Sequence, residues 1–147
     1  MNEERFDALT EELLEKECFV LDILPRQVGA ERSAAWFAAE DFFLKPERRR
    51  ALYEKFASVL IKLSCYYDLA LCADGVWAGR PGPDTLWERV AGCGETGWCN
   101  ILLPEEEALI ALRGGDLYLT VYHPSAALSD DIRQLAAGEG LYYRRGV

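Results

Sequence analysis

Apolar residues recur with a helical period in two long segments of the chain. In residues 3–17 they stand three or four positions apart, which places them on one stripe of a helix. Asn2 is a suitable N-cap, and the acidic residues after it suit the positive end of the helix dipole. Residues 46–65 show the same period, and Pro46 is favoured at a first helical position. Both segments are predicted to be helices.

Short apolar segments bounded by turn residues predict strands. The expected strands are residues 18–24, 67–72, 86–93, 98–103 and 141–143. Residues 33–44 are ambiguous, because their alanines favour a helix whereas their aromatic residues suit a buried strand. A strand is favoured for the first half of that segment. Residues 73–83 are rich in glycine and proline and are predicted to form a loop or an irregular hairpin tip.

The clearest hairpin pattern surrounds Gly114 and Gly115. Residues 108–112 are all apolar, and aliphatic residues stand at every second position in residues 116–122. A two-residue Gly-Gly loop is typical of a type I′ turn, which would place Leu112 opposite Leu117. In that register the alternate apolar residues of both strands share one face, and we expect that face to be core.

These elements define the fold class as α+β. With a further short helix expected at residues 130–137, the sequence predicts two or three helices and about six strands, mostly joined as hairpins. We therefore expect a mainly antiparallel sheet with the helices packed on one face of it. The chain has 147 residues, of which 50% are hydrophobic and 28% charged, as in an ordinary globular protein. Residues 1–147 are interpreted as a single globular domain.

Charge and the N-terminal segment narrow the class of protein. The net charge of −9 argues against binding to nucleic acid and to anionic membranes, both of which need clustered basic residues. The first residues show no basic region followed by an apolar one, so no secretory signal is expected. The longest apolar run, residues 34–39, is too short to cross a bilayer. Five cysteines in no disulfide-type spacing suit a reducing compartment, and we expect a cytoplasmic protein.

The segment Gly92-Cys93-Gly94-Glu95-Thr96-Gly97 matches the G-x-G-x-x-G pattern of phosphate-binding loops. A dinucleotide loop needs a strand before it and a helix after it, because the N–H groups of that helix hold the pyrophosphate. The residues that follow, 98–104, have instead the composition of a strand. The kinase version of the motif needs a longer chain with H-R-D and D-F-G segments, which this sequence lacks. The glycines are therefore interpreted as a tight turn.

The same turn decides how two cysteines are placed. A three-residue hairpin loop at residues 95–97, with Gly97 in the left-handed conformation, would put Cys93 directly opposite Cys99. A two-residue loop would put them on opposite faces, so their pairing stays open. Zinc needs four ligands at characteristic spacings, and two cysteines do not supply them. We expect buried cysteines, no metal and no cofactor.

Other polar residues do not form a catalytic pattern. His123 is the chain's one histidine, and a general base would also need a nucleophile and an orienting acid nearby. The three glutamates at residues 105–107 are interpreted as a solvated turn. The sequence contains no G-x-S-x-G, H-E-x-x-H or P-loop motif. These observations lean against an enzyme.

Trp77 and Arg80 are the candidate binding residues. Both lie in the glycine- and proline-rich segment, and loops carry function more often than frameworks do. An exposed tryptophan beside an arginine has the composition of an interface hot spot. The leading hypothesis is a non-enzymatic, cytoplasmic protein-binding domain of an adaptor, regulatory or immunity type, with a homodimer as one form of such binding. The alternative is a small-molecule-binding protein or an unrecognised enzyme with an aromatic-lined pocket.

Overall fold

The computed structural model describes residues 1–146 as helices around one sheet. The α-helices are α1 (Glu3–Leu13), α2 (Ser33–Phe43), α3 (Pro46–Leu63), α4 (Pro83–Ala91) and α5 (Ala126–Gly138), and a short 3-10 helix, η1, spans Ala30–Arg32. The strands are β1 (Cys18–Asp22), β2 (Ala70–Ala73), β3 (Val76–Gly79), β4 (Trp98–Leu103), β5 (Ala108–Arg113), β6 (Tyr118–Tyr122) and β7 (Tyr142–Arg145). Within these residues, no helix is long and apolar enough to cross a membrane.

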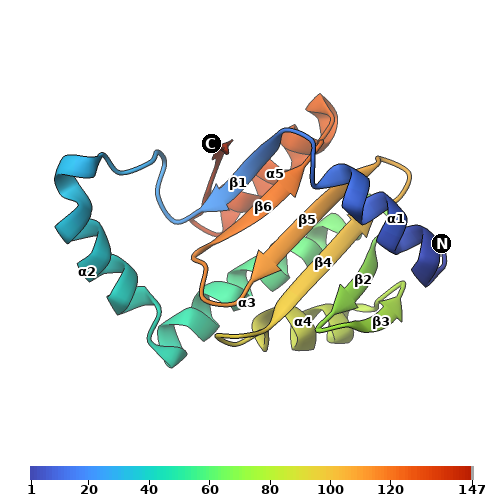
Figure 1. Ribbon diagram of the computed structural model, residues 1–147, viewed down its shortest axis with the longest axis horizontal. Helices are drawn as coiled ribbons and strands as arrows, with labels where there is room; N and C mark the ends of the chain where they lie inside the picture. Colours follow the sequence, from blue (N-terminus) through green and yellow to red (C-terminus); the bar gives the residue numbers. More distant parts are fainter. Residues whose placement is uncertain (147) are drawn as a thin grey trace.

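All of these strands belong to one sheet in the order β3-β2-β4-β5-β6-β1-β7. Every pairing in it is antiparallel. The middle strands follow one another along the chain, whereas β1 comes from near the N-terminus and lies between β6 and the C-terminal β7 (Figure 1). The expected α+β class with a mainly antiparallel sheet is confirmed, with seven strands and five α-helices in residues 1–146.

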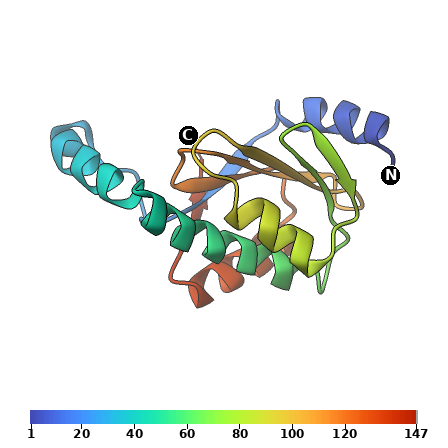
Figure 2. The same cartoon turned by 90° about the horizontal axis from the view of Figure 1, so that it is seen from below.

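Helices cover both faces of the sheet, which corrects the expectation of a single covered face. Figure 2 shows α3, α4 and α5 on one side and α1 on the other. The larger core lies beneath the three helices, where Phe56 and Leu60 of α3 pack against alternate strand residues such as Ile101 and Leu119. The smaller core lies beneath α1, where Phe6 and Leu13 pack on the opposite side chains of the same strands, such as Leu102 and Leu109.

Two predicted strands are helices. Residues 33–43 form α2 because the segment finds no neighbouring strand, so the helix preference of its alanines prevails. Most of residues 86–93, expected as a strand, belong to α4, which begins with Pro83 at a first helical position and buries Leu86 and Val90 one turn apart.

The Gly-Gly hairpin has the expected core face and a different register. Ile110 pairs with Val121, two residues beyond its expected partner Leu119. The connection is therefore longer than a two-residue turn, and Tyr53 of α3 fills its interior. The Tyr53 hydroxyl donates to the Asp116 carbonyl oxygen at 2.8 Å and accepts from the Gly115 N–H at 3.1 Å. A side chain from a distant helix is thus hydrogen-bonded to the backbone of this turn.

Candidate functional site

Residues 24–45, which we call the arm, leave the body of the protein and return to it. The arm consists of a linker after β1, the short helix η1 and helix α2. Figure 1 shows α2 standing away from the sheet, joined to the rest by the linker at one end and by the start of α3 at the other. None of the residues of α2 is buried, although most of them are alanine or aromatic.

The outer surface of the arm carries large aromatic side chains. Phe37 is 62% exposed and Phe42 is 48% exposed, and Phe43 is exposed as well. Phe42 and Phe43 meet edge to face with ring centroids 5.2 Å apart, and the Arg48 guanidinium carbon lies 3.8 Å from the Phe42 centroid. These contacts are local, so they hold the rings in place without removing them from solvent. An apolar helix surface left open in this way is typical of an interaction site.

The inner surface of the arm, between its linker and α2, forms a hollow of about 440 Å³ that is lined by arm residues alone. Its wall includes Leu24, Val28 and Ala39, and Trp36 of α2 lies in it while packing against the edge of the larger core. The hollow continues into a smaller one of about 250 Å³ that shares Trp36 and is bounded on the body side by Tyr118. Arm and body therefore enclose an open groove with aromatic side chains on both walls.

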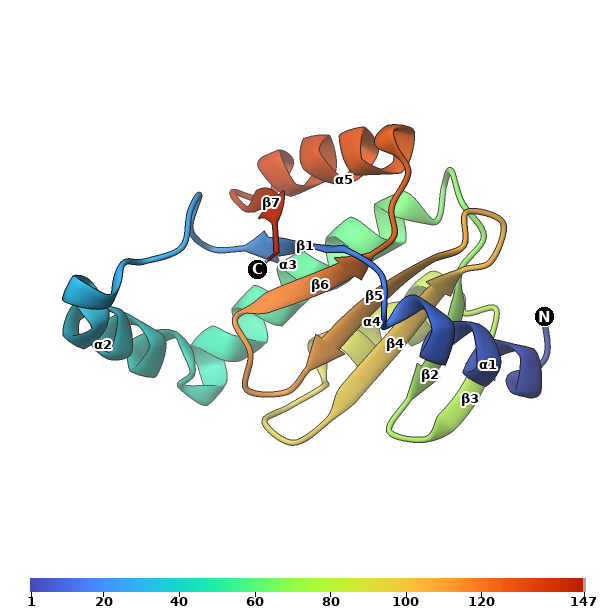
Figure 3. The same cartoon turned by 45° about the horizontal axis from the view of Figure 1, so that its top comes forward.

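The groove runs onto the part of the sheet that α1 leaves uncovered. Figure 3 shows this open face of β6 and β1 beside α1. Tyr118, Thr120 and Tyr122 line a third hollow of about 330 Å³ there, together with Val20 and Cys18. Burial raises the pKa of Tyr118 and of Tyr122, so both phenols keep their protons at neutral pH and can donate hydrogen bonds.

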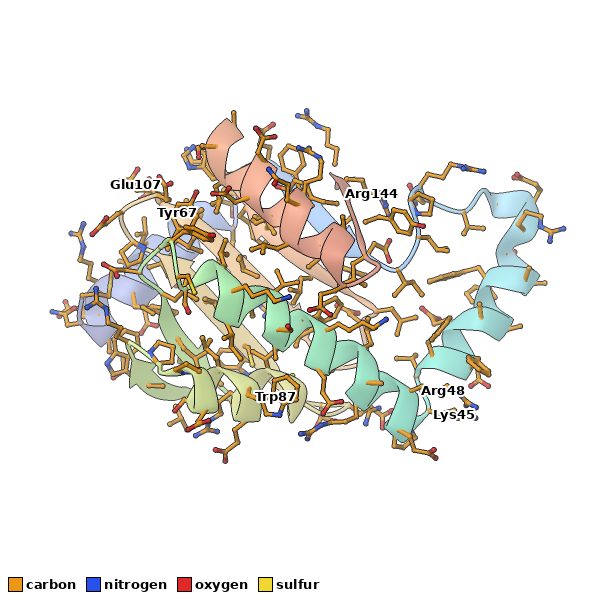
Figure 4. All side chains as sticks on the ribbon, turned by 180° about the vertical axis from the view of Figure 1, so that it is seen from behind. Lys45, Arg48, Tyr67, Trp87, Glu107 and Arg144 are labelled. Atoms are coloured by element: carbon orange, nitrogen blue, oxygen red, sulfur yellow. The ribbon has the colours of Figure 1, made fainter. Side chains whose placement is uncertain are left out.

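Arg144 of β7 is the basic group on the body side of this groove, and Arg26 and Arg32 line it from the arm. Its Nη2 lies 2.7 Å from Oδ2 of the buried Asp22, and its buried Nε has no hydrogen-bond partner among residues 1–146. Figure 4 shows Arg144 at the edge of the body that faces the arm, with Lys45 and Arg48 at the corner where α2 meets α3. Cationic groups therefore stand on both sides of the groove.

Charge is divided unevenly between the arm region and the rest of the chain. Residues 24–50 hold six of the 16 basic residues and four of the 25 acidic ones. The remaining chain holds ten basic and 21 acidic residues. Within the arm itself three basic residues balance three acidic ones, so the excess of positive charge lies beside the arm, at the start of α3. This distribution favours contact between the start of α3, beside the arm, and an acidic surface.

The predicted binding residues Trp77 and Arg80 lie at the other end of the sheet from the arm. Trp77 is half-buried in the smaller core, where its ring meets Phe6 edge to face with centroids 5.0 Å apart. Arg80 is exposed and forms an ion pair with Asp68. Both residues line one hollow of about 440 Å³ with Asp68 and Glu105. The structure thus brings them together, and their role in binding stays a prediction.

The glycine-rich motif has the reverse of a dinucleotide-binding context. Helix α4 precedes it and strand β4 begins directly after Gly97, as the composition of residues 98–103 indicated. The predicted hairpin is wrong, because a helix and not a strand enters the turn. Gly94 adopts a φ of 75°, whereas Gly97 does not lie in the left-handed region. Cys93 and Cys99 are both buried and free.

Two other sequence candidates, His123 and the segment of three glutamates, meet through one backbone contact. His123 is exposed, with a φ of 58°, and its Nδ1 lies 2.9 Å from the Glu107 carbonyl oxygen. That contact joins the loop after β4 to the end of β6. The group that it places beside the imidazole is a carbonyl oxygen, which is not a nucleophile for catalysis. Among residues 1–146, no group of three or more metal-ligating side chains is close enough to hold an ion.

The aromatic surface of the arm and the position of Arg144 were not found from the sequence. One signal was available for the arm. Residues 33–44 are apolar on every side of a helix, which is unusual for a surface helix of a globular protein. Comparison of the chain with protein-family models, with curated proteins and with solved structures finds no match.

Proposed function

We propose that this protein is a non-enzymatic protein-binding domain whose binding surface is the arm. One observation carries the proposal: α2 holds Phe37, Phe42 and Phe43 in solvent on a helix that buries none of its residues. Aromatic side chains supply much of the energy of protein interfaces, because they bury a large area with few rotatable bonds. An odd number of cysteines supports a cytoplasmic location, where the role would be of an adaptor, regulatory or immunity type.

The partner should present an apolar groove with an acidic rim. The groove would receive Phe37 and Phe42, while acidic side chains would face Lys45 and the arginines at the start of α3. Exposed charges at the rim act mainly on the association rate, and their effect weakens as salt screens them. We therefore expect binding to become slower at high salt while the aromatic contact keeps most of the affinity.

The experiment compares three tagged proteins in a pull-down from the native cells. The arm variant carries Phe37→Gln and Phe42→Gln, which remove two rings from an exposed helix and retain its helix preference. The matched control is Tyr66→Gln, which removes a ring that is 72% exposed but lies outside the arm. Surface changes of this kind usually alter stability by less than about 0.5 kcal/mol, so both variants should fold.

The proposal is supported when a protein held by the wild type and by Tyr66→Gln is lost with the arm variant, and when the purified pair shows the same difference in affinity. Equal capture by all three proteins would rule the arm out as the binding surface. Analytical ultracentrifugation of the purified chain tests whether it forms a homodimer. A mass that doubles with concentration in the wild type and stays monomeric in the arm variant would identify a second copy as the partner.

The groove favours a small-molecule ligand as the second candidate function. Its largest hollow, about 440 Å³, lies within the range of roughly 300–1,000 Å³ that ligand sites occupy. Trp36 lines this hollow and the adjoining one of about 250 Å³, so it could hold an apolar or aromatic ligand in either. Tyr118 and Arg144 line the adjoining hollow and could contact a polar part of the ligand that extends there. Native mass spectrometry of protein purified from its own cells tests this. A stoichiometric small molecule, with no captured protein, would reverse the order of the two candidates.

A further inference from the structure

Cys93 and Cys99 lie together where α4 ends and β4 begins. Cys93 follows α4, and its N–H donates to the Val90 carbonyl oxygen at 3.2 Å, which continues the last turn of the helix. Cys99 is the second residue of β4, paired with Leu112 of β5 and with Ala73 of β2. Its Sγ lies 3.4 Å from the Arg89 carbonyl oxygen, so it reaches back to α4. Both thiols belong to the larger core cluster, and a side-chain hydrogen bond between them is the largest influence on the pKa of each.

The turn that joins them is closely packed. A Cβ on Gly97 would clash with the Cys93 carbonyl oxygen and lie 3.2 Å from its sulfur. The Gly114 N–H of the next hairpin donates to the Gly97 carbonyl oxygen at 2.7 Å. Any side chain at position 97 would therefore push the turn away from Cys93. The last glycine of the G-x-G-x-x-G pattern is explained by this close approach to the Cys93 carbonyl group.

The surroundings favour a thiolate on Cys93 rather than on Cys99. In the neutral pair the Cys99 thiol can donate to Arg89, and on ionisation of Cys93 it can turn to that sulfur. This hydrogen bond lowers the pKa of Cys93 against the opposing effect of burial, and the charges of Arg113 and Arg49 lower it further. The same hydrogen bond and burial raise the pKa of Cys99. Cys93 is 8% exposed and Cys99 is 1% exposed, so the more acidic thiol is also nearer to solvent.

We propose that Cys93 and Cys99 form an oxidisable dithiol that hydrogen peroxide converts to an intramolecular disulfide. The Cys93 thiolate attacks one peroxide oxygen and the O–O bond breaks, which gives a Cys93 sulfenic acid and hydroxide that takes up a proton to form water. The Cys99 sulfur then attacks the Cys93 sulfur, and hydroxide leaves and takes up the Cys99 proton as a second water. Two thiols lose two electrons and two protons, and one peroxide becomes two waters.

Other cysteines of the chain provide internal controls. Cys65 is exposed directly after α3 and is therefore the thiol most accessible to a reagent in bulk water. Cys72 is buried beneath α1, and burial raises its pKa. If exposure alone decided the reaction, Cys65 would be oxidised first. If the paired geometry decides it, Cys93 and Cys99 react first.

The test treats the folded full-length protein with one equivalent of hydrogen peroxide and maps its thiols by mass spectrometry. We expect a loss of about 2 Da, a cross-linked peptide that contains Cys93 and Cys99, and three thiols left of five. In Cys99→Ser the sulfenic acid on Cys93 has no resolving thiol, so dimedone should label Cys93. Cys93→Ser should lose both products, whereas Cys65→Ser should retain the cross-link.

Oxidation of Cys65 before the pair, or a disulfide that joins any other two cysteines, would overturn the proposal. So would a wild-type protein in which Cys93 and Cys99 stay reduced while the same peroxide oxidises a small thiol in the same tube. Wild-type mapping needs no variant, so the result stands even where a serine substitution unfolds the chain. The outcome is independent of the arm and does not depend on the proposed function.

Discussion

Asp22 and Arg144 form an ion pair that joins the two ends of the chain. Nη2 of Arg144 lies 2.7 Å from Oδ2 of Asp22, and the pair links β1 to the C-terminal β7. The other carboxylate oxygen accepts a hydrogen bond from the Ile23 N–H at 2.7 Å. Both side chains are largely removed from solvent and lie in the wall of the groove beneath the arm. The pair therefore fixes the edge of the sheet from which the arm departs.

Arg144→Ala should lower the free energy of unfolding by about 2 kcal/mol, because it leaves the buried Asp22 carboxylate without its partner. The matched control is Arg145→Ala, which breaks the exposed ion pair with Glu17 on the same strand. Exposed pairs contribute about 0–1 kcal/mol, so this variant should differ little from the wild type. Urea unfolding of both proteins gives the comparison, and equal losses would contradict a structural role for the Asp22–Arg144 pair.

Trp77→Ala should destabilise the protein by about 2–3 kcal/mol, since the ring fills the smaller core against Phe6 of α1. Arg80→Ala removes an exposed ion pair and should change stability by less than about 1 kcal/mol. Thermal unfolding separates the two effects. If Arg80→Ala lowers partner binding while the arm variant does not, the binding site predicted from the sequence is correct and the arm is not the main surface.

The sequence predicted correctly those helices and strands that are determined mainly by local preferences. The helical stripe in residues 3–17 and Pro46 at the start of α3 predicted helices that the structure contains, with α1 ending earlier, at Leu13. The strands β4, β5 and β6 were also found, because short apolar segments bounded by turn residues indicate strands whatever their register. The error at α4 arose because a glycine-rich turn was taken to need strands on both sides. Pro83 instead indicated the start of a helix, since proline is favoured at the first helical position.

Relationships between distant residues could not be predicted in the same way. Nothing local indicates that Asp22 meets Arg144 across most of the chain, or that Tyr53 is hydrogen-bonded to the hairpin turn after β5. The exposure of Phe37 is likewise a tertiary property, because the same alanine-rich helix would be buried if another element covered it. The candidate site therefore depends on tertiary contacts, and on the exposure of α2, which the local sequence pattern does not predict.

The turn after β5 also gives a prediction about glycine. A Cβ on Gly114 would lie 2.5 Å from the Gly94 carbonyl oxygen and 2.6 Å from that of Glu95, both of them backbone atoms that cannot rotate away. Gly114→Ala should therefore destabilise the protein by more than about 1 kcal/mol. Gly138→Ala is the control, because it meets no atom within 4 Å in α5 and should be neutral or stabilising by up to about 1 kcal/mol. Denaturant midpoints that fall by the same amount in both variants would contradict this packing.

Glu139 should make stability depend on pH in the acid range. A hydrogen bond from the Ser58 hydroxyl at 2.7 Å, with Lys62 at 3.2 Å, lowers the pKa of Glu139 against a smaller opposing effect of burial. A carboxyl whose pKa is lower in the folded state stabilises the fold fully above its unfolded pKa, and this contribution is lost as pH falls through the folded pKa.

Glu139→Gln should therefore lower the free energy of unfolding at pH 7, by about 1 kcal/mol for the loss of a charge-assisted hydrogen bond near the surface. The difference from the wild type should shrink below about pH 4.3, the ordinary value for glutamate, and vanish below the folded pKa. Urea unfolding at several pH values measures it, with Glu95→Gln as the control for removing an exposed negative charge. A difference that stays constant from pH 7 to pH 3 would mean that the Ser58 and Lys62 contacts do not depend on the charge of Glu139.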